Sequence, residues 1–153
     1  MAQQAQDSSI FAAVELLKDN GFDALAEAVT VLMNTAMVAE RSDYLGARPY
    51  ERTEERRGYA NGFKAKTVKS RLGELPLRVP QTRDGEFYPQ SLEKGLRSER
   101  ALLLSIAEMY VQGVSTRRVK KIVEELCGMD VSSTQVSRAA AELDDLLTAW
   151  RER

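Results

Sequence analysis

The side chains that most often carry chemistry are scarce in this sequence of 153 residues. It contains no histidine, which excludes His-dependent catalytic triads, HExxH zinc sites and Cys/His zinc fingers. Its one cysteine, Cys127, falls at the end of an apolar helical pattern, so a core position is favoured over a nucleophile. A single cysteine cannot form an internal disulfide, and we therefore expect a cytoplasmic protein.

Acidic side chains gather near the end of the chain, where they could suggest a two-metal site. The six acids are Glu124, Glu125, Asp130, Glu142, Asp144 and Asp145. Nothing in their spacing fixes a ligand geometry, so a solvated helix surface is the better interpretation. We predict no catalytic residue, no metal site and no cofactor in this chain.

The basic side chains are unevenly distributed. The formal charge of −1 is the sum of −5 over residues 1–45, +8 over residues 46–121 and −4 over residues 122–153. Within Arg56–Arg83, eight Lys or Arg residues face one acid, Glu74. Such a run can be a solvated face, but this density favours a polyanion partner, with DNA as the leading candidate.

Residues 1–45 are predicted to be an N-terminal segment of amphipathic helices. A first helix is expected over 10–18 after a Ser8 or Ser9 cap, and a second over 22 to about 41, where apolar residues recur every three or four positions. The apolar face needs a partner, either the rest of the chain or a second copy, so we expect a homo-oligomer. No strictly apolar run approaches the roughly 20 residues of a membrane span, and no membrane contact is predicted.

Residues 46–90 are predicted to be a linker followed by a basic β-hairpin. Two alternating stretches, 67–72 and 75–79, flank Gly73-Glu74, which has the composition of a two-residue turn. This register pairs Lys69 with Arg78, and such a like-charge pair favours an external anion. The cations of the hairpin are therefore predicted to bind DNA phosphates. They are Lys64, Lys66, Lys69, Arg71 and Arg78.

Residues 91–153 are predicted to form three helices with the pattern of a helix-turn-helix. The third helix has the clearest start, a capping box of Ser132 and Gln135 with Val131 and Val136 as a hydrophobic staple. A three-helix bundle with a polar outer face is the alternative. Phosphate contacts are predicted from the second helix, and base-edge contacts from the third. The first set is Arg117, Arg118 and Lys121, and the second is Ser133, Thr134, Gln135 and Arg138.

The expected fold is thus mainly α with a small β-hairpin: N-terminal amphipathic helices, a basic hairpin and a C-terminal helix-turn-helix unit of three helices. Two aromatic residues of the basic stretch, Tyr59 and Phe63, flank Asn61-Gly62. They could stack on bases or pack against the hairpin, and packing is the preferred interpretation.

Five motifs, in this order, are similar to a known family. They are RRGYANG, RLGELPLRVP, RDGEFYP, MYVQGVSTRRV and SSTQVSR. The stretch of about 44–153 resembles the front half of Mutator-type bacterial insertion-sequence transposases, of the insertion sequence 256 type. Residues 1–43 fit more loosely, as a helical amino-terminal segment.

The resemblance implies a DNA transposase whose ribonuclease-H-like domain holds two Mg²⁺ ions on an Asp-Asp-Glu triad. No residue here matches a triad position, and similar proteins run on beyond the point where this chain ends. We therefore expect the DNA-binding portion alone, inactive in strand cleavage by itself and associated with the bacterial nucleoid. Its expected partner is double-stranded DNA carrying the terminal inverted repeats of the element.

Two other functions stay open from the sequence. The chain could be an interaction module that dimerises with the full-length enzyme and inhibits it, because residues 10–41 combine net acidity with an apolar face. A helix-turn-helix transcription regulator would use the same three helices.

Overall fold

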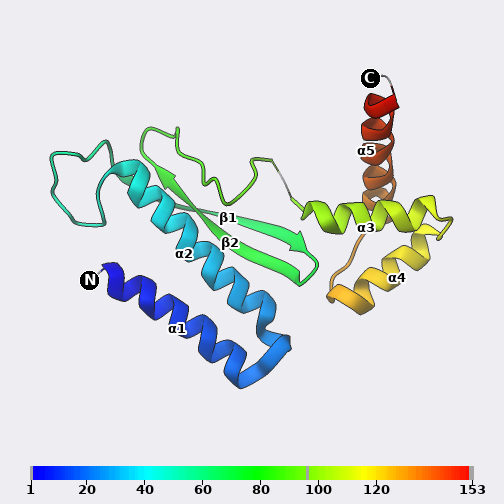
Figure 1. The fold of residues 1–153 in the computed structure, drawn as a ribbon, viewed down its shortest axis with the longest axis horizontal. Helices are drawn as coiled ribbons and strands as arrows, with labels where there is room; N and C mark the ends of the chain where they lie inside the picture. Colours follow the sequence, from blue (N-terminus) through cyan, green and yellow to red (C-terminus); the bar gives the residue numbers. More distant parts are fainter. Residues whose placement is uncertain (1, 96, 152–153) are drawn as a thin grey trace. The chain divides into compact units, whose positions relative to one another are not determined.

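The structure, a computed structural model, describes residues 2–95 and 97–151. It is mainly helical with one two-stranded β-hairpin, which confirms the predicted fold class at that level. The elements, labelled in Figure 1, are α1 (Ala2–Asn20), the 3₁₀ helix η1 (Gly21–Ala24), α2 (Leu25–Leu45), β1 (Ala60–Ser70), β2 (Gly73–Thr82), α3 (Arg100–Val111), α4 (Thr116–Cys127) and α5 (Ser133–Arg151).

The chain divides into two compact units. The first unit consists of Met1–Val68 and Leu75–Leu96, and the second of Lys69–Glu74 and Arg97–Arg153. The tip of the hairpin therefore belongs with the three C-terminal helices. The division into segments 1–45, 46–90 and 91–153 stays a prediction, and residues 1, 96, 152 and 153 lie outside the described part of the chain.

The first unit begins with α1, which runs beside α2 in the opposite direction (Figure 1). Its start at Ala2 shows that the predicted start near Ile10 is wrong, because the alanines and glutamines before Ile10 favour a helix and nothing interrupts it. α1 ends at Asn20, close to the predicted stop. Gly21, with φ of +59°, turns the chain into η1.

α2 is the central helix of the first unit. It starts at Leu25 after η1 and continues past the predicted end to Leu45, where Gly46 caps it in the left-handed region with φ of +63°. One side of α2 faces α1 and another lies against the hairpin. The core between α2 and the hairpin consists of Met37, Val68, Leu75, Leu77, Val79 and Leu92.

The stretch Ser8–Leu45 is long and apolar enough, by length and composition alone, to cross a membrane. The core helix of a soluble protein passes the same test. Polar groups of α2 bind the hairpin: the Asn34 carboxamide oxygen accepts a hydrogen bond from the Arg78 amide at 2.8 Å, and Arg41 donates to the Gly62 carbonyl at 3.2 Å. We therefore interpret α2 as the core helix of the first unit, and the predicted lack of a membrane contact stays a prediction.

The hairpin turns at Arg71-Leu72, two residues earlier than predicted. β2 therefore begins at Gly73, which places Lys69 opposite Glu74 and not opposite Arg78. Lys69 Nζ lies 3.9 Å from Glu74 Oε1. The predicted like-charge pair is therefore wrong because the register is shifted, and an anion at the hairpin no longer follows from it.

Gly73 explains the shifted turn. It occupies the first position of β2 with φ of +115°, a backbone conformation that side chains with a Cβ rarely adopt, and a Cβ there would lie 3.3 Å from the Cys127 carbonyl oxygen. The tip also forms a short parallel bridge in the second unit. The Lys69 amide donates to the Arg97 carbonyl at 3.0 Å, and the Glu99 amide donates to the Lys69 carbonyl at 2.7 Å.

The second unit packs α5 against both α3 and α4. The predicted start of α5 is confirmed. The Gln135 amide donates to Ser132 Oγ at 3.2 Å, and the Ser132 amide donates to Gln135 Oε1 at 2.9 Å. Val131 and Val136, the predicted staple, are both buried. The core consists of Leu102, Ile106, Ala107, Val119, Val123, Met129, Val131, Val136 and Ala139.

Candidate nucleic-acid interface

Two of the five predicted phosphate contacts on the hairpin already have partners inside the second unit. Lys69 Nζ donates to the Asp130 carbonyl oxygen at 2.5 Å. Arg71 holds Glu99 with Nε at 2.9 Å and Nη2 at 2.8 Å from Oε1. Burial raises the pKa of Glu99, but the hydrogen bonds from Arg71 outweigh burial and hold that pKa below its usual value. Both cations therefore anchor the hairpin tip.

The other three hairpin cations have no ion pair among the described residues. Lys64 is exposed. Lys66 is half-buried, and its Nζ lies 3.0 Å from the Tyr88 hydroxyl. Arg78 is exposed, and its guanidinium carbon lies 4.7 Å from the centre of the Phe63 ring. Of the five predicted contacts, these three remain available to an anion.

The sequence reasoning missed a group of arginines that contact Phe63 and Tyr59. Phe63 receives Arg78 at 4.7 Å and also Arg41 from α2 at 5.0 Å. Tyr59 receives two arginines as well, Arg56 at 5.2 Å and Arg83 at 5.7 Å. Both rings lie outside the two apolar cores and are substantially exposed, at 43% for Phe63 and 58% for Tyr59. Both rings lie against arginines and outside the apolar cores, and Arg78, which contacts Phe63, is itself a hairpin residue, so the preference for packing over base stacking stays a prediction.

In the second unit, two of the four cations of α4 form ion pairs with acidic side chains. Lys120 lies 2.9 Å from Asp130 Oδ1, and Lys121 lies 3.7 Å from Glu125 one turn along the helix. The hydrogen bond to Asp130 raises the pKa of the exposed Lys120. Arg117 and Arg118 are exposed at the start of α4 and have no ion pair in the part of the chain that the structure describes. The first turn of α4 is thus the cationic end of the helix.

The start of α5 presents polar side chains to solvent. Ser133, Thr134, Gln135 and Arg138 are all exposed, as the base-contact prediction requires. Gln135 has a second task, however, since its Oε1 accepts the Ser132 amide in the capping box. Arg138 carries no ion pair within the described residues and keeps all of its donors for a ligand.

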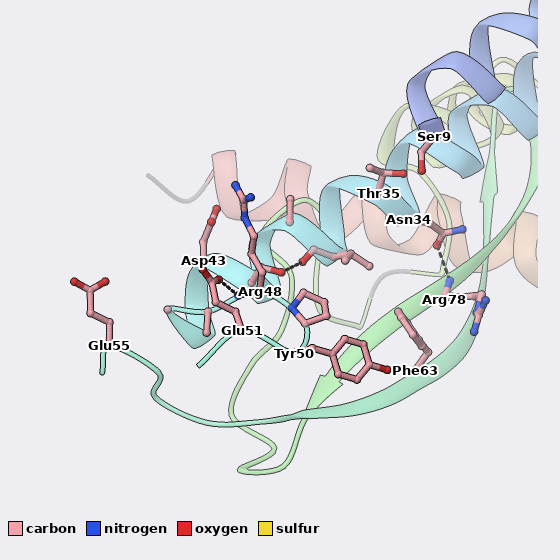
Figure 2. Close-up of a pocket in the computed structure, with 16 residues that line it drawn as sticks. Ser9, Asn34, Thr35, Asp43, Arg48, Tyr50, Glu51, Glu55, Phe63 and Arg78 are labelled. Carbon is pink, nitrogen blue, oxygen red and sulfur yellow. Dashed lines mark hydrogen bonds between the residues drawn. The ribbon is translucent and has the colours of Figure 1, made fainter. Parts of the chain in front are cut away.

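A hollow in the first unit has a volume of about 1090 Å³ and lies beside α2 and the loop after it. Figure 2 shows Phe63, Arg78 and Asn34 on one side and Arg48, Glu51 and Glu55 on the other. The Glu51 carboxylate accepts a hydrogen bond from the Arg48 amide at 2.9 Å. The carboxylates Glu51 and Glu55 make the hollow as a whole unsuited to a compact anion, whereas its Phe63 side carries the positive charge of Arg78.

Metal binding and thiol chemistry find no support in the described residues. They contain no group of three or more His, Cys, Asp or Glu side chains that could hold a metal ion. The two Mg²⁺ ions that the family resemblance implies therefore do not fit the described part of the protein. Cys127 packs against the core of the second unit, and burial raises the pKa of its thiol, as expected for an unreactive cysteine.

The comparisons with known proteins agree with the motifs. The chain matches the family "Transposase, Mutator family" over residues 1–153 and belongs to that family. It is 56% identical over 155 residues to the transposase for insertion sequence element IS406 of Burkholderia multivorans. It is 48% identical over 131 residues to the ISRM5 transposase of Rhizobium meliloti and 44% identical over 131 residues to the IS256 transposase in transposon Tn4001 of Staphylococcus aureus.

These relatives are much longer than the chain. The alignment covers all of this chain and 40% of the IS406 protein. For the ISRM5 and IS256 proteins it covers 86% of this chain and 33% and 34% of the relative.

Proposed function

We propose that this chain is the DNA-binding portion of an insertion-sequence transposase and that it recognises the terminal inverted repeats of its element. The observation that carries the proposal is the start of α5, where a closed capping box fixes the helix and leaves Ser133, Thr134 and Arg138 exposed. A capped helix with exposed hydroxyl and guanidinium groups at its amino end has the chemistry to read base edges in a major groove.

The three C-terminal helices support a helix-turn-helix role. α4 ends at Cys127, Gly128 adopts the left-handed conformation with φ of +64°, and α5 begins at Ser133. The exposed Arg117 and Arg118 on the first turn of α4 suit phosphate contacts beside a recognition helix. In this arrangement α5 reads the DNA and α4 fixes its position on the backbone.

The hairpin contributes sequence-independent affinity in this proposal. Lys64, Lys66 and Arg78 supply positive charge from the first unit. Contacts with phosphates set affinity and salt dependence, but they do not discriminate between sequences. Substitutions in the hairpin should therefore change the affinity for every DNA sequence, whereas substitutions in α5 should change the preference for one sequence over another.

Strand cleavage and transfer are proposed for the whole transposase and not for the described residues. Together with the Asp-Asp-Glu domain and its Mg²⁺ ions, this chain would deliver the element's ends to the reaction in the bacterial cytoplasm. Hydroxyl-radical footprinting on a DNA fragment that carries one end tests the proposal. We expect protection confined to the terminal inverted repeat, and uniform cleavage at protein concentrations that shift the fragment would contradict it.

A second candidate function, self-association, is favoured by the exposed apolar side of the first two helices. Ile10, Phe11, Val14 and Leu17 of α1 are exposed, and Phe22 in η1 is 91% exposed. Residues 1–45 carry a net charge of −5, which is unfavourable next to DNA. We propose that this side pairs two copies of the chain, as symmetric DNA sites often require.

A further inference from the structure

Two aromatic rings at the open end of the hairpin are each contacted by two arginines. We call Arg41–Phe63–Arg78 the inner stack and Arg56–Tyr59–Arg83 the outer stack. Distances from guanidinium carbon to ring centre run from 4.7 to 5.7 Å, all within the range of a cation–π contact. A chain of this length would hold about two such contacts by the average for proteins. The described residues hold five, and four of these lie on only two rings.

The charge of the inner stack is not neutralised within the described residues. Arg41 is only 6% exposed, and its recorded hydrogen bond goes to the uncharged Gly62 carbonyl at 3.2 Å. Burial lowers the pKa of Arg41, which reflects the cost of holding this charge away from water. Arg78 is exposed, and its guanidinium carbon lies 4.7 Å from the centre of the Phe63 ring. Two positive charges therefore share one ring without a carboxylate.

The outer stack is similar. The Arg56 guanidinium donates to two backbone carbonyls, of Arg48 at 3.0 Å and of Glu51 at 2.7 Å, which fix its position, and it has no ion pair in the described part of the chain. The nearest carboxylate in sequence to Arg83 is Asp84. That side chain accepts hydrogen bonds from Thr82 and from the Tyr44 hydroxyl, the latter at 3.3 Å, which hold it away from an ion pair with the arginine.

The two stacks are close enough to meet one DNA strand. The Arg83 amide donates to the Tyr59 carbonyl at 2.9 Å, so the outer stack closes the open end of the hairpin. Tyr59 and Phe63 are four residues apart, which spans at most about 13 Å in extended chain. Nucleotides of one strand advance about 3.4 Å along the axis of B-DNA, so both stacks fit within about four nucleotides.

We propose that the two stacks form a phosphate-binding surface that grips the backbone of duplex DNA. The rings hold the guanidinium planes in place, so little side-chain freedom is lost when each arginine meets a phosphate. Arg78 and Arg83 contact the DNA backbone. The buried Arg41 does not contact DNA; it holds the Phe63 ring and adds to the positive electrostatic potential at this surface. This inference rests on the proposed function, because it adds Arg41, Arg56, Arg83 and the two rings to Arg78, which the hairpin pattern had already assigned to phosphate contacts.

The test measures fluorescence anisotropy of labelled end and scrambled duplexes across a salt series. We expect Arg78→Gln to weaken binding to both duplexes about equally, by about tenfold, and to reduce the slope of log K against log salt by about 0.9. Lys94→Gln, which removes an exposed charge from the same unit without touching a ring, is the matched control. An equal effect of both variants, or an unchanged slope for Arg78→Gln, would overturn the proposal.

A double-mutant cycle separates the ring from its charge. Phe63→Leu keeps apolar volume but removes the ring, so we expect it to weaken binding in the wild type and to have no further effect beside Arg78→Gln. Equal losses in both backgrounds would contradict the stack. Circular dichroism confirms that each variant folds, and Arg78→Lys, which keeps the charge, should retain the salt slope while losing affinity.

The outcomes distinguish this inference from the proposed function. Selective binding of the end duplex with no effect of the stack variants would refute the stacks and leave end recognition standing. Failure of the wild-type chain to bind either duplex would refute both.

Discussion

Arg138 is the residue on which sequence discrimination depends in this account. It is exposed on the second turn of α5, and none of its donors is bonded to a described residue. In the neighbouring Gln135, by contrast, the side-chain oxygen Oε1 already accepts the Ser132 amide in the cap. A bidentate arginine–guanine contact is worth about 1–3 kcal/mol of discrimination. We therefore predict that Arg138→Ala reduces the preference for end over scrambled duplex at least about fivefold, measured as the ratio of the two Kd values. As a control, Arg117→Ala should weaken both equally; an unchanged ratio for Arg138→Ala would remove it from base reading.

The capping box makes a separate prediction about stability. Ser132→Ala removes the acceptor for the Gln135 amide, and loss of such a cap costs about 1 kcal/mol of unfolding free energy. Urea denaturation monitored by circular dichroism measures it. Ser133→Ala is the matched control, because Ser133 is exposed and the cap is made by Ser132 and Gln135. Equal midpoints for the two variants would show that the box does not stabilise α5.

At the scale of elements, local patterns could predict most helices but not the hairpin register. Residues 131–136 contain the capping box and the staple of the α5 start, so this start could be predicted from the sequence. The Gly73-Glu74 pair has the composition of a turn, yet Gly73 is needed as the first strand residue beside the Cys127 carbonyl. That requirement comes from a residue far away in the sequence, and no local pattern carries it.

The hairpin tip makes a prediction about pH. Because the pKa of Glu99 is lowered in the folded protein, its bond to Arg71 contributes stability above the unfolded pKa, and that stability is lost as pH falls through the folded value. We expect the urea midpoint of the wild type to fall on acidification more than that of Glu99→Gln, so that the two curves converge at low pH. A constant gap between them down to acid pH would contradict a stabilising Glu99 carboxylate.

Tertiary contacts also decided which candidate cations stay available. Lys69 and Arg71 looked like phosphate ligands, but their partners Asp130 and Glu99 lie 61 and 28 residues away, beyond the reach of a pattern search. Tyr59 and Phe63 were visible as aromatics in a basic stretch. Their contacts with Arg41 from α2 and with Arg83 beyond β2 became visible only in the folded hairpin.

For the whole molecule, the exposed apolar side of α1 predicts self-association. Val14→Glu places a charge in the middle of that side, since Ile10 and Leu17 lie one turn before and after it. We expect sedimentation of the 153-residue chain to show a dimer for the wild type and a monomer for Val14→Glu. Ala12→Glu, on the opposite side of the same helix, adds the same charge and should leave the dimer intact. A wild-type monomer at high concentration would contradict the pairing.

The measurement that tests the central claim most directly is the binding of the unaltered chain to one end of its own element and to a scrambled duplex. Fluorescence anisotropy should be recorded for both across a salt series. The account predicts at least about tenfold tighter binding to the end, roughly 1.4 kcal/mol, with a steep salt dependence for both duplexes. Equal affinity for the two duplexes at every salt concentration would contradict recognition of the terminal inverted repeats.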